Sequence, residues 1–390
     1  MMWITVLYMS FILDGSDWGF FAHRLINRVA VYTLPSEMIG WYKPNIDYIA
    51  EHAVDPDKRR YATTHEAVRH YIDLDQWGTL PFDHVPKYWD QALALNLELY
   101  QVTGIDTVYL LNAIPFQSWN DTIVDIDQRL MLVRNHYLGQ YYEDEQTISC
   151  KSLKAFFPGI KCNEASLIYI DDVFTEHGIV PYHLRSMQSR LTNAFKENNL
   201  ESIIRTSAEI GHYIGDACVP LHTTSNYNGQ LTNQVGIHAF WESRIPELFA
   251  VAEFDMVVGS AQYIEDPASY FWNLVLDSHR EVQRVLDLEK ELSIRFPTDQ
   301  QFCFEDRLNQ TVKTQCAEYA KAYHLAMDKM VEDRFRVAVK ALGDSWYTAW
   351  IDAGQPPTPA QKKINEKLLA DEEVEKAFQS GKAKGREHDN

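Results

Sequence analysis

Apolar residues recur every three to four positions along most of this chain, which is the spacing of helices that bury one face. The clearest stretch covers residues 191–216. Within it, Asn198-Asn199 indicates a break between two helices, and Pro220 ends the pattern because proline cannot continue a helix. We therefore predict an all-α protein. Two further stretches have helical spacing: 237–245 and 317–350.

Alternation typical of strands is scarce, and residues 106–114 form the best candidate. The segment from about 96 to 176 mixes patterns, and we interpret it as an insertion that elaborates the core. A Gly-Gln-Pro-Pro run beginning at Gly354 predicts a linker. We expect one main domain over 18–353, followed by a linker and a charged, solvated tail over 354–390.

The N-terminal 13 residues are apolar, too short to span a bilayer and about the length of a signal-peptide core. They lack a basic start and a small-residue cleavage site. We interpret 1–17 as a degenerate signal peptide, the alternative being an apolar segment packed on the fold. Export would place the protein outside the cell or in the periplasm, although a cytoplasmic location stays open. No other segment resembles a transmembrane anchor.

Five cysteines are present and none forms a Cys-x-x-Cys pair, which argues against a cysteine-rich zinc site. Cys150 with Cys162, and Cys303 with Cys316, lie close enough in sequence to close short disulfide loops, as an exported protein allows. Cys218 is left over. The formal net charge of −19 argues against a duplex-binding protein that relies on a broad basic face. The sequence indicates no obligate protein partner.

Histidines and carboxylates are concentrated between residues 212 and 242. His212 and Asp216 are four apart in a helical stretch, so both side chains project from one face. His238 and Glu242 repeat that spacing, and His222 lies between the two pairs, just past the proline. Imidazole and carboxylate groups are the ligands that Zn²⁺ accepts where cysteine is absent. We therefore predict metal binding here.

A second cluster lies upstream, where Asp55 and His70 occur in a charged stretch that leads into a helix. Spacing does not choose between Asp55 and other nearby candidates, which are Asp57, His65 and Asp73. His23, further upstream, is on its own an ordinary helix residue.

Four segments together resemble the superfamily of S1/P1-type nucleases and zinc-dependent bacterial phospholipases C. They are WGFFAH, DPDKRRYATTHEAVRHYID, HYIGDACVPLH and GIHAFWE, and the match in residue type and order runs from Trp18 to about Leu248. The resemblance implies a helical fold with three zinc ions in a cleft. The interval from His70 to His212 is longer than is usual in that superfamily.

The resemblance also implies three ligand sets, one for each zinc ion. The third set requires Trp18 to be the mature N-terminus, and without that processing two ions are expected. These sets are Asp55, His70, His212 and Asp216; His222, His238 and Glu242; and His23, Asp216 and Trp18.

The implied activity is hydrolysis of phosphodiesters in single-stranded nucleic acid or of nucleotide phosphoesters by a metal-activated water. Asp55 would also orient the water, and Lys58 stands where nucleases of the family carry a phosphate-binding arginine. Tyr71 and Asp73 are candidates for substrate binding.

Two alternatives remain. Glu242 in place of aspartate, and the short interval from His222 to His238, are typical of the phospholipase branch. A zinc-stabilised binding protein without catalysis is the other, although His222, His238 and Glu242 supply only three ligands and leave a position open, as catalytic sites do.

Overall fold

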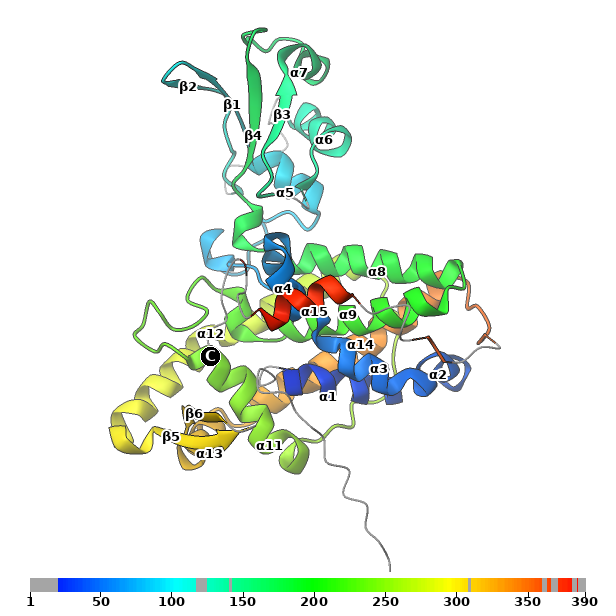
Figure 1. The fold of residues 1–390 in the computed structure, drawn as a ribbon, viewed down its shortest axis with the longest axis vertical. Helices are drawn as coiled ribbons and strands as arrows, with labels where there is room; N and C mark the ends of the chain where they lie inside the picture. Colours follow the sequence, from blue (N-terminus) through cyan, green and yellow to red (C-terminus); the bar gives the residue numbers. More distant parts are fainter. Residues whose placement is uncertain are drawn as a thin grey trace, which may run out of the picture.

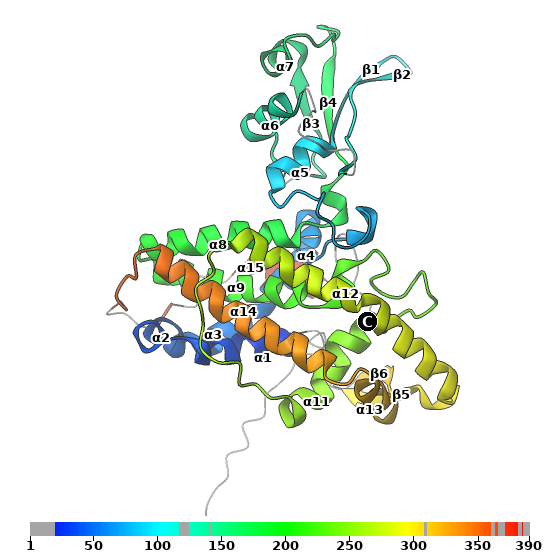
Figure 2. The same cartoon turned by 180° about the vertical axis from the view of Figure 1, so that it is seen from behind.

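The computed structural model describes residues 20–116, 125–139, 142–307, 310–359, 363–365, 371–380 and 384. The predicted signal peptide, 1–17, and the candidate ligand Trp18 lie outside these residues. A helical body carries a smaller lobe that projects from it, as Figures 1 and 2 show from opposite sides. The helices of the body are α1 (Phe20–Ala30), α2 (Ser36–Tyr42), α3 (Ile46–Glu51), α4 (Asp55–Ala62), α8 (Val180–Lys196), α9 (Leu200–Ala217), α10 (Ile237–Ala239), α11 (Ile245–Glu253), α12 (Pro267–Arg295), α13 (Ala317–Ala326) and α14 (Met330–Asp352).

The helix pair predicted over 191–216 is confirmed. α8 ends at Lys196 and α9 begins at Leu200, and the side chain of Asn199 caps α9 by accepting a hydrogen bond from the Ser202 amide at 3.0 Å. α9 ends at Ala217, before Pro220. The stretch 317–350 forms α13 and α14.

The body is built around α9, whose residues are nearly all buried. The first half of α9 contacts α2 and α14 through a single residue, Ser207, which uses both its side chain and its backbone carbonyl. Ser207 bonds the Tyr42 hydroxyl through its own hydroxyl at 3.0 Å and accepts a hydrogen bond from the Trp346 indole through its carbonyl at 3.2 Å. Burying large aromatic rings with satisfied polar atoms fixes α9 in the centre of the body.

The all-α prediction describes the body apart from one two-stranded hairpin, and it fails for the lobe. α5 (Trp89–Asn96), α6 (Ile126–Asn135) and α7 (Cys150–Phe156) accompany an antiparallel sheet of order β2-β1-β4-β3. Its strands are β1 (Leu97–Thr103), β2 (Asp106–Leu111), β3 (Gln146–Ser149) and β4 (Leu167–Asp172). The strand expected within 106–114 is therefore confirmed. β1 and β4 were missed because their residue types do not follow the burial: Gln101 and Asp172 occupy buried positions, whereas Leu167 is exposed.

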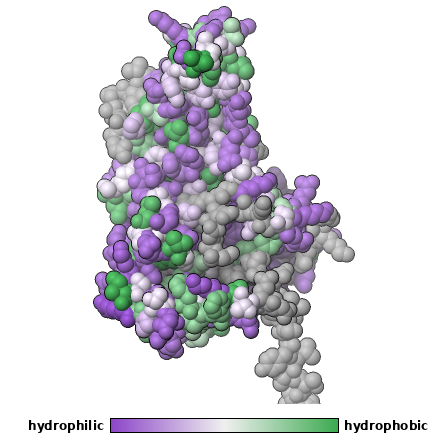
Figure 3. Space-filling model, turned by 60° about the vertical axis from the view of Figure 1, so that its left-hand side comes forward, coloured by the Kyte–Doolittle hydropathy of each residue, from purple (hydrophilic) through white to green (hydrophobic). Residues whose placement is uncertain are grey.

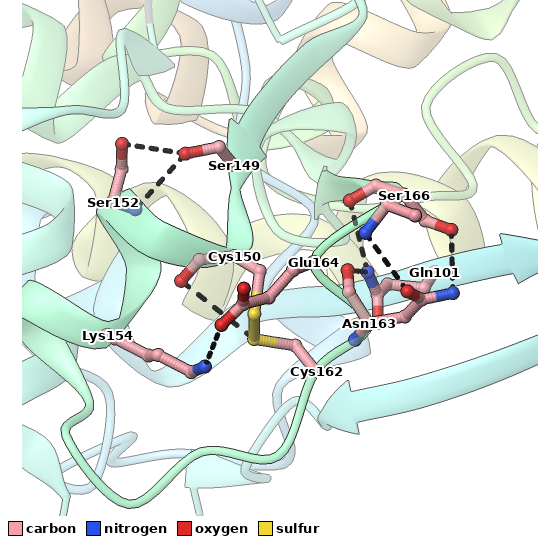
Figure 4. Close-up of a disulfide and its surroundings, with 10 residues drawn as sticks. Gln101, Ser149, Cys150, Ser152, Lys154, Cys162, Asn163, Glu164 and Ser166 are labelled. Carbon is pink, nitrogen blue, oxygen red and sulfur yellow. Dashed lines mark hydrogen bonds and ion pairs between the residues drawn. A yellow bond between two sulfur atoms is a disulfide. The ribbon is translucent and has the colours of Figure 1, made fainter.

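A disulfide and one glutamine fix the loop between α7 and β4 (Figure 4). Cys150 at the start of α7 is bonded to Cys162 in that loop. Gln101 of β1 donates to the carbonyl of Asn163 at 2.9 Å and accepts from its amide at 2.9 Å. The loop is thus tied to both a helix and a central strand.

A second disulfide, Cys303–Cys316, joins the ends of a hairpin made of β5 (Phe302–Arg307) and β6 (Gln310–Gln315). Cys218 is buried and free. Both predicted pairings are confirmed, and such disulfides persist in oxidising compartments.

The C-terminal tail contains a helix where we expected only a solvated chain. α15 (Glu372–Gln379) lies against α4, as Figure 1 shows. The Phe378 ring contacts Tyr61 edge-on at 5.0 Å and lies 6.2 Å from Phe20. Three partly buried apolar residues, Val374, Ala377 and Phe378, dock this otherwise polar helix, and a composition-based prediction misses them.

On the face drawn in Figure 3, hydrophilic residues predominate and strongly hydrophobic ones are scattered. None of the helices in the described ranges is long and apolar enough to cross a membrane.

Candidate metal centre

The centre is built on the C-terminal half of α9. His212 and Asp216 lie one turn apart on one face, and both side chains are almost completely buried. His212 Nε2 lies 3.3 Å from Asp216 Oδ2. A buried carboxylate and imidazole need partners, because unpaired polar groups in the interior are costly. Three other segments bring those partners.

α1 brings His23, and two glycines of α9 make room for α1. A Cβ at Gly215 would lie 2.7 Å from His23 Nδ1, and a Cβ at Gly211 would lie 1.9 Å from Asn27 Oδ1. The Asn27 amide bonds the carbonyls of Ile49 and Ala208 and so pins α1 to α9. With α1 held this close, His23 Nε2 lies 3.4 Å from Asp216 Oδ1, and its ring stacks on that of His212 at 4.1 Å.

The segment that begins with α4 brings a carboxylate and a histidine. His70 Nδ1 lies 2.9 Å from Asp216 Oδ2 and 3.0 Å from His212 Nε2. Asp57 Oδ1 lies 3.6 Å from His212 Nε2 and 3.8 Å from His70 Nδ1. The carboxylate that the structure brings to this histidine pair is therefore that of Asp57.

Asp55, which the resemblance assigned to this group, is placed elsewhere. Its Oδ2 lies 2.7 Å from His52 Nδ1 and its Oδ1 lies 3.9 Å from Lys58 Nζ. Both aspartates belong to the first turn of α4, two residues apart, so they project from different faces of the helix. Asp57 projects toward His70 and His212, whereas Asp55 projects toward His52.

The third set comes from the two short segments after α9. Pro220 starts a 3-10 turn (Pro220–Thr223) that carries His222, while α10 and the following π-helical turn (Phe240–Arg244) carry His238 and Glu242. Glu242 Oε2 lies 2.8 Å from His238 Nε2 and 3.2 Å from His222 Nε2. Glu242 Oε1 lies 3.3 Å from His23 Nε2, which joins this set to the others.

Backbone carbonyls orient three of the histidines. His212 Nδ1 donates to the carbonyl of Ala53 at 2.9 Å, and His222 Nδ1 donates to that of His70 at 2.7 Å. His238 Nδ1 donates to the Tyr227 carbonyl at 3.1 Å. With Nδ1 protonated, each Nε2 lone pair faces the carboxylates. This arrangement is typical of metal-ligating histidines, whose outer nitrogen is fixed by a second partner.

The donors fit metal ions in three groups, which are His23, His212 and Asp216; Asp57, His70 and His212; and His222, His238 and Glu242. Within each group the ligand atoms lie within 4.8 Å of one another. Tetrahedral zinc, with bonds of about 2.0–2.1 Å, holds its ligand atoms roughly 3.3 Å apart, which is close to the contacts found here. The set of nitrogen and oxygen donors, with no cysteine among them, suits zinc and related divalent metals.

Without metal, the pKa values of several groups in the centre are shifted far from their ordinary values. Burial disfavours a charged His23, but the carboxylates of Glu242 and Asp216 outweigh it and raise the pKa to about 9. Burial, with His23 and His70 nearby, lowers the pKa of His212 to about 4 despite Asp216. Burial opposes ionisation of Glu242, yet His222 holds its pKa well below the usual range. The carboxylates therefore stay ionised at neutral pH, as metal ligands must be.

The other predicted site residues lie at the edge of this centre or in the core. Lys58 Nζ is 3.5 Å from Glu375 Oε2 of α15. Asp73 is largely buried, and its amide bonds the His177 carbonyl. Tyr71 is buried, with its hydroxyl bonded to the Glu176 carbonyl at 2.9 Å, so the structure places it in the core and not against a substrate. His65, another candidate ligand, pairs with Asp144 at 3.6 Å.

Glu66 is a functional candidate that the sequence analysis missed. It is fully buried, and its Oε1 lies 3.7 Å from His70 Nε2, on the side of the ring away from Asp216. It also accepts a hydrogen bond from the Tyr213 hydroxyl and one from Arg69 at 2.6 Å. A carboxylate behind a ligating histidine orients the ring and raises its basicity. The four-residue spacing from Glu66 to His70 was the available signal.

The structure thus brings eight of the predicted or competing ligands into one centre, with Asp57 in the place expected for Asp55. No protein-family model and no curated protein matches this sequence.

Proposed function

We propose that this protein is a zinc-dependent phosphoester hydrolase. The observation that carries the proposal is the sharing of ligands between groups: His212 belongs to two of the three, and Asp216 contacts members of all three. Structural zinc sites are usually isolated and closed by four ligands. Overlapping groups of three instead suit a multi-metal site with open positions.

Zinc bound in these groups would lower the pKa of a water molecule and neutralise the charge of a phosphate. The chain's own residues divide the remaining work. The buried histidines and Asp216 hold the metals. Asp57 is the most exposed ligand, with 20% of its side chain accessible, so it borders the side from which water arrives and can accept the proton of that water. Lys58 lies one residue away in sequence and would contact a non-bridging phosphate oxygen once Glu375 is displaced.

We propose single-stranded nucleic acid or nucleotide phosphoesters as the substrates, following the family resemblance. Phospholipid head groups are the alternative, which Glu242 and the interval from His222 to His238 favour. The two disulfides support a protein that folds in an oxidising compartment, and hence secretion or residence in the periplasm.

The test is to purify the exported protein, sequence its N-terminus and count zinc per chain. A start at Trp18 with about three ions, as the resemblance implies, supports the full site, whereas a start at Met1 with no metal contradicts the proposal. The same sample is then assayed on single-stranded DNA, RNA, 3′-nucleotides and phosphatidylcholine, before and after chelation. Hydrolysis of phosphatidylcholine alone would refute the nuclease preference and favour the phospholipase.

A further inference from the structure

A hollow lined by arginines lies beside the metal centre, between α4, α8 and α9. Its volume is about 490 Å³, and its arginines are Arg59, Arg69, Arg190 and Arg205. Arg205 precedes His212 by seven residues, or two turns, so it lies on the same face of α9 as the ligands and about 10 Å from them along the axis. Two of the helices that enclose this hollow, α4 and α9, also build the centre (Figure 1).

Three of the arginines form a ladder on the inner wall. Arg59 Nη1 and Arg205 Nε share the same oxygen of Glu209, at 2.9 and 3.1 Å. Arg59 Nε and Arg69 Nη1 share one oxygen of Glu66, at 3.3 and 2.6 Å. Three guanidinium groups are thus held by two carboxylates. The ladder keeps a positive charge in excess, and its guanidinium groups are preorganised by bonds to buried acids.

The opposite wall, on α8, adds groups without acidic partners. Arg190 is exposed and forms no ion pair within the described part of the chain; its Nη1 lies 3.9 Å from Met187 Sδ. His183, two turns earlier on α8, has a buried Nε2 with no hydrogen-bond partner in the described ranges. Among the residues that line the hollow, Glu201 and Glu209 are the carboxylates.

The positive hollow contrasts with the chain as a whole, which carries 55 acidic residues against 36 basic ones. A chance patch on such a surface would be acidic. Proteins bind phosphate with guanidinium groups that converge on one point, at least one of them without an acidic partner. Each guanidinium group can donate two parallel, charge-assisted hydrogen bonds to the phosphate. Polar groups that are buried without partners favour a site that a ligand completes.

We propose that this hollow is a second anion site, separate from the metal centre, that binds a phosphate group. Arg190 and Arg205 contact the anion from opposite walls, and the Arg59–Arg69 ladder supplies the excess charge behind it. Glu66 connects the two sites, since it contacts the ladder on one side and His70 on the other. The bound group is either free phosphate or the phosphate of a phosphorylated small molecule.

Calorimetric titration of the full-length protein with its metals bound, at low salt, tests this, and binding to the hollow is identified by its loss in variants of the hollow. The probes are inorganic phosphate and a nucleoside 5′-monophosphate. The variants are Arg190→Gln, Arg205→Gln and the control Arg280→Gln, which removes one exposed charge from α12, where Arg280 is 52% exposed. We expect one phosphate per chain, an affinity roughly tenfold lower in Arg190→Gln and Arg205→Gln, and no change in Arg280→Gln.

Comparable affinities for the two probes identify free phosphate as the ligand. A nucleotide affinity at least about tenfold higher identifies a larger phosphorylated molecule. Absence of binding by both probes overturns the proposal, and so does binding that the Arg190→Gln and Arg205→Gln variants leave unchanged. Because the variants lie outside the metal ligands and no product is measured, none of these outcomes depends on whether the protein is a hydrolase.

Discussion

The metal centre and the insertion lobe are stabilised by different means. In the centre, buried charges face one another, and three histidines are fixed by backbone carbonyls. In the lobe, a small antiparallel sheet packs with three helices, and a disulfide ties one of its loops to α7. The lobe meets the body through packed aromatic rings, which include Trp77, Phe116 and Phe174.

This difference implies two separate dependences. Without a bound cation, the buried charges that it would bridge repel one another or leave unfilled space between them. The stability of the centre therefore depends on metal. The lobe needs oxidation and not metal, because its cross-link is covalent. Variants in either region should therefore leave the other largely unaffected.

The largest effect is expected for Asp216→Asn. Asp216 belongs to one ligand group and lies 2.9 Å from His70 and 3.9 Å from His222 of the other two, so the loss of its charge removes an anion that contacts all three groups. We expect loss of at least one metal ion and a fall in phosphodiester hydrolysis of more than about 100-fold. Metal analysis and turnover measure this. Asp171→Asn, an exposed position in the lobe, is the control, and a metal-replete Asp216→Asn protein would contradict the role of Asp216.

Removal of the lobe disulfide should destabilise the lobe and leave the metal centre unchanged. Replacing Cys150 and Cys162 with serine releases a loop closed over 12 residues of sequence, with an expected loss of about 3 kcal/mol of lobe stability. Hydrogen exchange should accelerate in β3 and β4, while zinc content stays at the wild-type level. If zinc is lost with the disulfide, the two regions are coupled and the comparison fails.

A matched pair on α4 sharpens the description of the centre. Asp57→Asn should lower zinc affinity by about 10- to 100-fold, because Asp57 is the carboxylate beside His70 and His212. Asp55→Asn should leave zinc affinity near the wild-type value. Competition with a chromophoric chelator gives both constants. A lower zinc affinity in Asp55→Asn than in Asp57→Asn would instead support Asp55 as the ligand, as the family resemblance implied.

The smallest effect is expected for Gly215→Ala. Alanine would ordinarily stabilise a helix interior by about 1 kcal/mol relative to glycine. Here the new Cβ would lie 2.7 Å from His23 Nδ1, so we expect a net loss of about 1 kcal/mol or more and displacement of His23 from its metal group. Thermal unfolding and metal content measure this. Gly159→Ala in the lobe, where the added Cβ has open space, is the control.

Much of the helical body could be predicted from the sequence. Periodicity reports which face of a segment is buried, and this gave α8, α9 and the break at Asn198-Asn199. Ligand pairs one helical turn apart, such as His212 with Asp216, were found for the same reason: their proximity is local. The lobe was predicted less well, because in β1 and β4 polar residues such as Gln101 and Asp172 occupy buried positions and hide the alternation.

Other features were decided by tertiary packing alone. Asp55 and Asp57 are both carboxylates near the start of α4, and only the docking of that helix on α9 selects Asp57. The close approach of α1, which brings His23 to Asp216, depends on two α9 glycines whose neighbours are far away in sequence. The arginine hollow likewise joins residues from separate segments. A sequence pattern indicates which face of a segment is buried, but not which distant segment buries it. The metal centre depends on those long-range contacts.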